Sequence, residues 1–358
     1  MSVQVSYKKQ TLLGIFLILI VLIAIEGIVR GYEYSVLCEN LFEHEAYQEI
    51  DFFKLKQICY DYKMIRYFSS PMIKPIPEQY SETVNINSFG FRGDQISEKK
   101  SDNTYRIIMI GGSTVFGTTS TADATTLPGY LQEFFRENEY NVEVINAGIP
   151  GTWSFYESYY IENHLKKFQP DLFIIYEGWN DAKRGNLFPE LLVEKQSIGF
   201  KNFVNYRTPF VIYEFFFSTI YTPPDLYDEK TIVKLVDNWR DRWKSVCESG
   251  NKENFSVIVM VQPALGSGEK PLVGFEKRFS NIPDWHKQTL NIMQKMVDSL
   301  DSLEACSDTF DYTKILDGVN KPIFVDEIHL SDEGNKIIAR EIFNDLIKSE
   351  MSNLIVKN

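Results

Sequence analysis

The amino-acid sequence predicts a mostly parallel α/β domain that follows one membrane-spanning helix. Two observations predict this fold class. Four short apolar runs, rich in β-branched residues, alternate with helix-compatible segments, which is typical of a buried parallel sheet covered by helices on both faces, in three α/β/α layers. The runs are 105–112, 142–148, 171–178 and 255–263. An uninterrupted apolar stretch near the amino terminus predicts the membrane helix.

The apolar stretch covers Thr11–Val29 and contains a single charged side chain. At about 1.5 Å per residue, 19 residues are long enough to cross a ~30 Å hydrocarbon layer. Lys8 and Lys9 precede it, so the positive-inside rule predicts a cytoplasmic tail (1–10), an anchor (11–29) and the remaining chain on the outer face of the cell membrane. A cleaved signal peptide is the alternative, but EGIVRGYEY lacks a small-x-small cleavage site.

The exported part divides into two regions. Residues 30–100 contain charged stretches, three prolines and the motif NINSFGFRG at 85–93, and they predict a stalk or cap. Residues 101–350 predict the catalytic domain, because the strand and helix patterns alternate there. The expected helices are 125–139, 153–168, 226–248, 284–303 and 331–348. In parallel sheets ligands bind beyond the carboxyl ends of the strands, so chemistry is expected in those loops.

One insertion, residues 186–227, departs from this pattern. Ten of the 28 residues in 200–227 are aromatic, against 14% for the chain. Two interpretations stay open: a packing subdomain, or a lid or acyl-binding wall beside the active site.

Composition excludes several classes of protein. With 44% hydrophobic and 24% charged residues the chain is globular rather than disordered, and its net charge of −12 disfavours nucleic acid as a partner. The four cysteines form no CxxC motif. On an exported body, Cys38 with Cys59 and Cys247 with Cys306 are possible disulfides, and buried free thiols are the alternative.

Four loops contain candidate catalytic groups. Ser113 follows the first strand in GGST, Gly148 follows the second in NAG, and Asn180 follows the third in GWND. Asp326 and His329 stand three residues apart in DEIH, a spacing at which the carboxylate can accept the imidazole Nδ1–H. Taken singly, these motifs are also typical of an N-cap serine and of ordinary turn residues.

Other chemistries lack their motifs. The sequence has no GxxxxGK[ST] loop, no GxGxxG, no HExxH and no His/Cys cluster, so neither a cofactor nor a metal site is predicted.

Together and in this order, GGST, NAG, GWND and DEIH resemble the four blocks of the SGNH (GDSL-type) hydrolase family. The resemblance implies a flavodoxin-like sheet, Ser113 as nucleophile, His329 as base and Asp326 as its orienting acid. It also implies an oxyanion hole made by the N–H groups of Ser113 and Gly148 and by the side chain of Asn180. The sequence departs from the family in having Gly112-Ser113-Thr114 instead of Asp-Ser-Leu, which removes a carboxylate beside the nucleophile.

The predicted function is a serine ester hydrolase, an acyl or acetyl esterase, that acts on O-acylated cell-surface glycans or on lipid esters. An O-acyltransferase that modifies a surface polysaccharide is one alternative, because water and a sugar hydroxyl can attack the same acyl-enzyme. A non-catalytic surface protein that binds glycans is the other.

Overall fold

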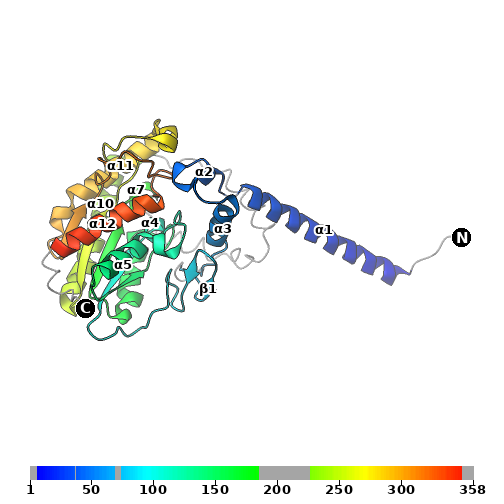
Figure 1. Cartoon of the computed structure of the whole chain (residues 1–358), viewed down its shortest axis with the longest axis horizontal. Helices are drawn as coiled ribbons and strands as arrows, with labels where there is room; N and C mark the ends of the chain where they lie inside the picture. The colour runs from blue at the N-terminus through cyan, green and yellow to red at the C-terminus, as the bar shows by residue number, and fades with distance from the viewer. Residues whose placement is uncertain (1–5, 37, 69–73, 185–225, 349–358) are drawn as a thin grey trace.

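A computed structural model describes residues 6–36, 38–68, 74–184 and 226–348 of the chain. Its centre is a five-stranded sheet in the order β4-β3-β5-β6-β7, in which every neighbouring pair is parallel. The strands are β3 (Tyr105–Gly111), β4 (Val142–Asn146), β5 (Leu172–Glu177), β6 (Ser256–Val261) and β7 (Asp308–Asp311). Helices flank the sheet, so the predicted α/β class is confirmed (Figure 1).

Successive side chains of β3 point to opposite faces of the sheet, as in any β-strand. Ile107 and Met109 are buried in the cluster that contains α5 (Leu127–Glu137) and α12 (Asp332–Lys348). Ile108 and Ile110 are buried on the other face, against α6, α10 and α11. Those helices are α6 (Ser154–Tyr160), α10 (Glu229–Glu253) and α11 (Asp284–Asp298). The three-layer arrangement follows from this alternation.

Two details differ from the sequence-based expectation. β7 is a fifth strand that apolar periodicity did not indicate, because DTFD at this edge of the sheet has only one apolar residue. The helix expected at 153–168 begins as α6 and continues as a π-helical turn, Ile161–Leu165, and a 3-10 turn, Lys166–Phe168. Most of the aromatic-rich insertion lies outside the described residues, so its role stays a prediction.

The amino-terminal helix α1 (Tyr7–Val36) projects from the body, as Figure 1 shows. Within its segment Tyr7–Tyr32, an 18-residue window has a mean hydropathy of 3.0 and no residue buried in the structure, and the helix is long and apolar enough to cross a membrane. Glu26, the one charge in the apolar stretch, accepts a hydrogen bond from Arg30 Nε at 2.8 Å, one turn later. This pairing lowers the cost of placing either charge near lipid.

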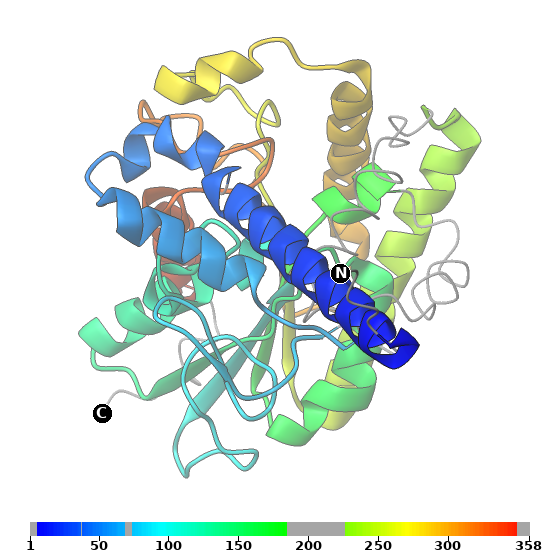
Figure 2. The ribbon, with the colours of Figure 1, turned by 90° about the vertical axis from the view of Figure 1, so that its right-hand side faces the viewer.

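The segment after α1 folds back on the domain. It comprises α2 (Glu39–Phe42), a 3-10 turn (Glu45–Tyr47), α3 (Phe52–Lys63) and a hairpin of β1 (Gln79–Tyr80) and β2 (Asn85–Ile86). Figure 1 shows α2 and α3 between α1 and the sheet, and Figure 2 shows them beside α1.

Two disulfides link distant segments. Cys38 is bonded to Cys59, which ties the start of α2 to α3, and Cys247 is bonded to Cys306, which ties α10 to the segment before β7. The sequence left open whether the four cysteines form disulfides or stay buried free thiols, and the structure has both disulfides. Disulfides are typical of proteins in oxidising compartments.

Candidate active site

The first candidate loop changes direction at two glycines. Gly111 ends β3, and a Cβ atom there would lie 2.3 Å from the carbonyl oxygen of Tyr176 on the neighbouring strand. A Cβ atom on Gly112 would lie 2.6 Å from Asn180 Nδ2. The contact at Gly111 is with backbone, so only glycine admits this close approach, whereas the contact at Gly112 is with the end of a side chain that can shift. In this chain the amide of Asn180 lies beside Gly112, on the side where the Asp-Ser-Leu pattern has a carboxylate side chain.

Ser113 is the first residue of α4 (Ser113–Phe116), directly after the turn. Residues at the start of a helix have backbone N–H groups without an acceptor inside the helix. The carbonyl of Ser113 accepts hydrogen bonds from Gly117 N at 2.9 Å and from Thr118 Oγ1 at 3.2 Å. These contacts fix the backbone of Ser113 at the carboxyl end of β3.

The structure brings Ser113 together with His329 and Asp326. His329 Nε2 lies 2.6 Å from Ser113 Oγ, and His329 Nδ1 lies 2.7 Å from Asp326 Oδ2. The Oδ1 atom of Asp326 accepts from the backbone N–H groups of Ile328 and His329, at 2.9 and 2.8 Å. Burial opposes ionisation of Asp326, but His329 and these hydrogen bonds outweigh it and hold the pKa of this carboxyl below its usual value.

Asn180, at the start of α7 (Trp179–Arg184), faces the same turn. Its Nδ2 atom donates to the carbonyl of Thr152 at 2.7 Å. An amide nitrogen carries two protons, so this hydrogen bond orients the group and leaves a second N–H for a ligand.

Gly148 does not fit its expected role as an oxyanion donor. Its N–H donates to Asn146 Oδ1 at 3.0 Å, inside its own loop. The glycine is instead required for packing, since a Cβ atom would lie 2.3 Å from Phe116 N in α4. The same loop contains a second glycine, Gly151, with φ 77°, directly before the Thr152 carbonyl that Asn180 contacts. In the sequence, Gly151 is the second glycine of NAGIPG at 146–151, and only the first was singled out.

Three buried carboxyl groups lie close together, one of them on the residue after Asn180, and no pattern in the sequence indicated that they meet. Glu157, Glu177 and Asp181 are at most 3% exposed. Ser154 donates to both oxygens of Asp181, through Oγ at 2.6 Å and N at 2.8 Å, and Arg242 Nη1 lies 3.9 Å from Asp181 Oδ1. One oxygen of Glu157 and one of Glu177 have no hydrogen-bond partner.

This clustering favours protonation of two of the three carboxyl groups. Burial, together with the charge of Asp181, raises the pKa of Glu157 to about 8 and raises that of Glu177 well above its usual value. The hydroxyl of Thr152 donates to Ile149 O at 2.7 Å and also lies 3.0 Å from Glu157 Oε1. Because a hydroxyl has one proton, a protonated Glu157 that donates to Thr152 satisfies both contacts.

The motif NINSFGFRG contacts α4, the helix that begins with Ser113, through Arg92. The guanidinium of Arg92, with a side chain only 1% exposed, donates to the carbonyls of Phe116 and Gly117 at the end of α4, at 3.1 and 2.6 Å. Its Nε atom donates to Asp123 Oδ1 at 2.8 Å. The lead-in segment therefore clamps the short helix that begins with Ser113.

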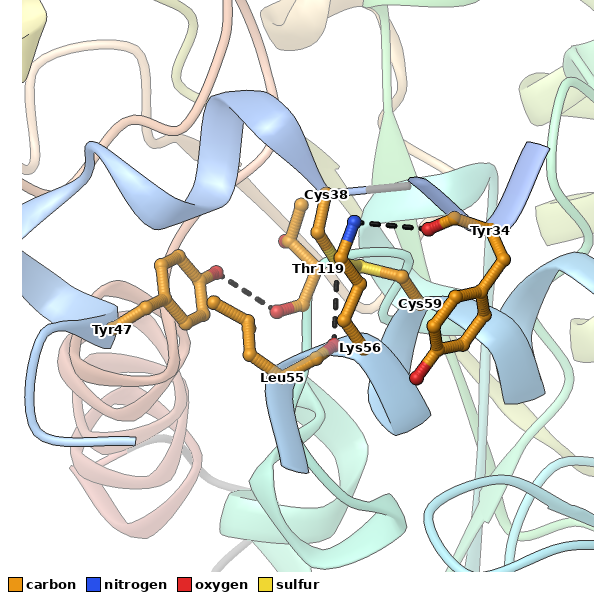
Figure 3. The surroundings of a disulfide bond; sticks show 7 residues. All are labelled: Tyr34, Cys38, Tyr47, Leu55, Lys56, Cys59 and Thr119. Carbon is orange, nitrogen blue, oxygen red and sulfur yellow. Dashed lines mark hydrogen bonds between the residues drawn. A yellow bond between two sulfur atoms is a disulfide. The ribbon is translucent and has the colours of Figure 1, made fainter. Parts of the chain in front are cut away.

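The segment around α2 and α3 contacts both catalytic loops. Tyr47 Oη donates to the carbonyl of Thr119 at 2.9 Å, as Figure 3 shows beside the Cys38–Cys59 disulfide. His44, fully buried, places Nε2 3.1 Å from the carbonyl of Phe324, two residues before Asp326. Residues 38–63 thus pack against the domain rather than standing apart from it.

The described residues contain few other side chains that could form a metal or catalytic site. No group of three or more His, Cys, Asp or Glu side chains there is arranged to hold a metal ion. His286 is buried and contacts the carbonyl of Leu265 through Nε2 at 2.8 Å.

A parallel α/β sheet with serine, histidine and aspartate in contact at its carboxyl edge is typical of α/β hydrolytic enzymes. Residues 107–342 match the GDSL-like lipase/acylhydrolase family, so the chain belongs to this family of carboxylic ester hydrolases, and the resemblance seen in the sequence is confirmed.

Three solved structures illustrate the similarity. An acetyl xylan esterase, AlAXEase, is 17% identical, with 68% of this chain and 100% of that chain covered and a TM-score of 0.42. A lipase/acylhydrolase from Enterococcus faecalis is 13% identical, with coverages of 71% and 98% and a TM-score of 0.43. The acetylxylan esterase Axe2 from Geobacillus stearothermophilus is 14% identical, with coverages of 68% and 94% and a TM-score of 0.40. None of the curated proteins matches the chain.

Proposed function

We propose that the protein is a serine esterase in which Ser113 is the nucleophile, His329 the general base and Asp326 the group that orients and stabilises the imidazolium. The observation that supports this most directly is the continuous hydrogen-bonded chain Ser113 Oγ–His329–Asp326, with distances of 2.6 and 2.7 Å. A serine hydroxyl is a weak nucleophile at neutral pH, so transfer of its proton to His329 Nε2 is what allows attack on an ester carbonyl.

The proposed oxyanion hole has three donors. Two of them are the Ser113 N–H and the second Nδ2 proton of Asn180. The hydrogen bond from Asn180 to Thr152 supports this role, because it fixes the amide before substrate binds. We propose Gly151 instead of Gly148 as the glycine of the hole, since it directly precedes Thr152 while the Gly148 N–H is engaged by Asn146. Each such donor typically lowers the barrier by about 3 kcal/mol.

The proposed place of action is the outer face of the cell membrane, with α1 as an uncleaved anchor. The length and hydropathy of α1 and the two disulfides support an exported, anchored domain. The proposed substrates are O-acyl groups of surface glycans or lipid esters. Because the acyl-enzyme can react with water or with a sugar hydroxyl, the same site would serve transfer as well as hydrolysis.

The test uses the full chain in detergent with a fluorophosphonate probe and with p-nitrophenyl acetate through octanoate. Wild type is compared with Ser113→Ala and with Ser302→Ala, an exposed serine that serves as matched control. Labelling and turnover that are lost in Ser113→Ala alone would support the proposal. Equal labelling of wild type and Ser113→Ala would refute the nucleophile. A folded wild type that binds acylated sugar without turnover would indicate the glycan-binding alternative.

A further inference from the structure

An exposed aromatic surface lies where α1 meets the body. Among the described residues after α1, most of the exposed large apolar side chains fall in residues 52–80, namely Phe52, Phe53, Tyr60, Phe68 and Tyr80. Phe52 and Phe53 begin α3 and are 51% and 72% exposed. Two adjacent exposed phenylalanines are costly in water and are typical of a surface that contacts something apolar.

This surface is continuous with the membrane-spanning helix. Tyr34 of α1 packs edge-on against Tyr60 of α3, with ring centroids 6.5 Å apart. Lys56 Nζ donates to the carbonyl of Tyr34 at 3.0 Å, and the Cys38–Cys59 disulfide fixes the same junction (Figure 3). We name Tyr34, Phe52, Phe53 and Tyr60 the aromatic collar.

The position of the collar along α1 corresponds to the membrane–water interface. The apolar span ends at Tyr32, and Tyr34 follows two residues, or about 3 Å, later. Tyrosine and other aromatic rings gather at that depth, where an apolar body and a polar tip are both accommodated. A lipid surface is therefore the occupant that continuity with α1 favours over a second protein.

The opposite side of α3 contacts both catalytic loops. Leu55 and Ile58 of α3 are buried with Val325, the residue before Asp326. Tyr62 Oη lies 3.1 Å from Thr118 Oγ1, and Thr118 donates to the Ser113 carbonyl. Since a helix with its side chains is about 10 Å thick, the collar and the Ser113 loop are separated by roughly that distance. Figure 2, seen along α1, shows α3 in front of α12, the helix that follows His329.

We propose, on the basis of the esterase function proposed above, that the aromatic collar rests in the headgroup layer and that the site acts on acyl esters of amphiphiles embedded in that bilayer. The collar fixes how the domain is tilted on the membrane, beyond what a single helix can fix. The anchor and the collar then keep the Ser113 loop within about one helix diameter of the headgroup layer. An ester carried on the outward-facing part of a membrane-embedded molecule is thereby held at high local concentration beside the site, while a freely soluble glycan gains nothing from this placement. In the reaction the acyl group passes from the amphiphile's oxygen to Ser113 Oγ and then to water, and the alcohol leaves with the proton carried by His329.

The depth of the collar is measured on the full chain in phosphatidylglycerol vesicles that contain brominated lipid. Phe53→Trp is compared with Tyr159→Trp, since Tyr159 is an exposed aromatic residue of α6, outside the collar. The proposal predicts strong quenching of the added tryptophan at 53 and little at 159. Equal quenching at both positions, or none at 53, would overturn the docking.

Activity is then measured on two kinds of ester with the same vesicles. Phe53→Ser should slow hydrolysis of vesicle-embedded ester about fivefold or more, through lost orientation, and leave p-nitrophenyl acetate hydrolysis unchanged; Tyr159→Ser should change neither. Release of fatty acid from the phospholipid itself, or of acetate from an acetylated alkyl glucoside in the vesicle, distinguishes the two sources of ester. A photo-crosslinker at 53 that captures protein instead of lipid would overturn the proposal.

Failure of the esterase function has a different signature. If Phe53→Trp is quenched but the wild type neither labels with fluorophosphonate nor turns over p-nitrophenyl acetate, the esterase is refuted and the docking stands. A wild type that hydrolyses p-nitrophenyl acetate and is inactive on every vesicle-embedded ester would refute the substrate class alone.

Discussion

Replacing Glu157 with glutamine should stabilise the folded chain at pH 8 and leave its stability almost unchanged at pH 4.5. Glu157 is 2% exposed in α6, beside Glu177 and Asp181, and its raised pKa reflects the cost of placing a second negative charge there. Glutamine has the same shape as the protonated carboxyl group. Its amide can donate to the Thr152 hydroxyl as the protonated acid does, so the contact is kept without a titratable proton.

The magnitude follows from linkage between protonation and folding. The native pKa of Glu157 is about 8 and that of the unfolded chain is 4.5, so the native state binds more protons between these values. The free energy of unfolding therefore falls as pH rises through this window, by up to about 1.4 kcal/mol per pH unit. Relative to low pH, where Glu157 is protonated in both states, the free energy of unfolding of the wild type is lower by about 0.4 kcal/mol at pH 4.5 and by about 4 kcal/mol at pH 8. These values are upper bounds, because relaxation of the protein and entry of water reduce the cost of the buried charge. Glu157→Gln removes this contribution.

The assay is urea unfolding of the full chain in detergent at pH 4.5, 6, 7 and 8, followed by tryptophan fluorescence. Glu137→Gln, at an exposed position of α5, is the matched control and should follow wild type at every pH. A difference between Glu157→Gln and wild type that grows steadily with pH would support the reasoning. A difference that is the same at pH 4.5 and pH 8 would refute it, because Glu157 would then have an ordinary pKa in the folded protein.

Three further predictions concern the catalytic carboxylate, the clamp and one disulfide. Asp326→Asn should lower kcat for p-nitrophenyl acetate about 10⁴-fold at neutral pH by favouring the wrong tautomer of His329, and a loss below tenfold would contradict the triad. Arg92→Ala should cost about 3 kcal/mol in urea unfolding, because it removes the buried donor to the carbonyls of Phe116 and Gly117, and unchanged stability would show that the clamp is dispensable. Cys247→Ser with Cys306→Ser opens a loop of 59 residues and should cost about 4 kcal/mol by the chain-entropy relation; thermal melts that match oxidised wild type would contradict this.

The sequence alone determined the features that depend on local pattern. Buried strands were predicted because β-branched runs with turn residues at both ends have few other stable arrangements. The pairing of Asp326 with His329 was also predictable, since three residues within one loop limit how far the two side chains can separate. The order of the four motifs then identified the family, and the family match over residues 107–342 confirmed it.

Only the tertiary structure decided what depends on contacts between distant segments. It assigned Gly148 to packing against α4, a role that its position after a strand did not indicate. It joined Glu157, Glu177 and Asp181 from α6, β5 and α7 into one buried cluster. It also placed α3 against the loops that contain Ser113 and His329. Periodicity reports which face of an element is buried, but the partner on that face is fixed only when the whole chain packs, because burial energy is non-directional.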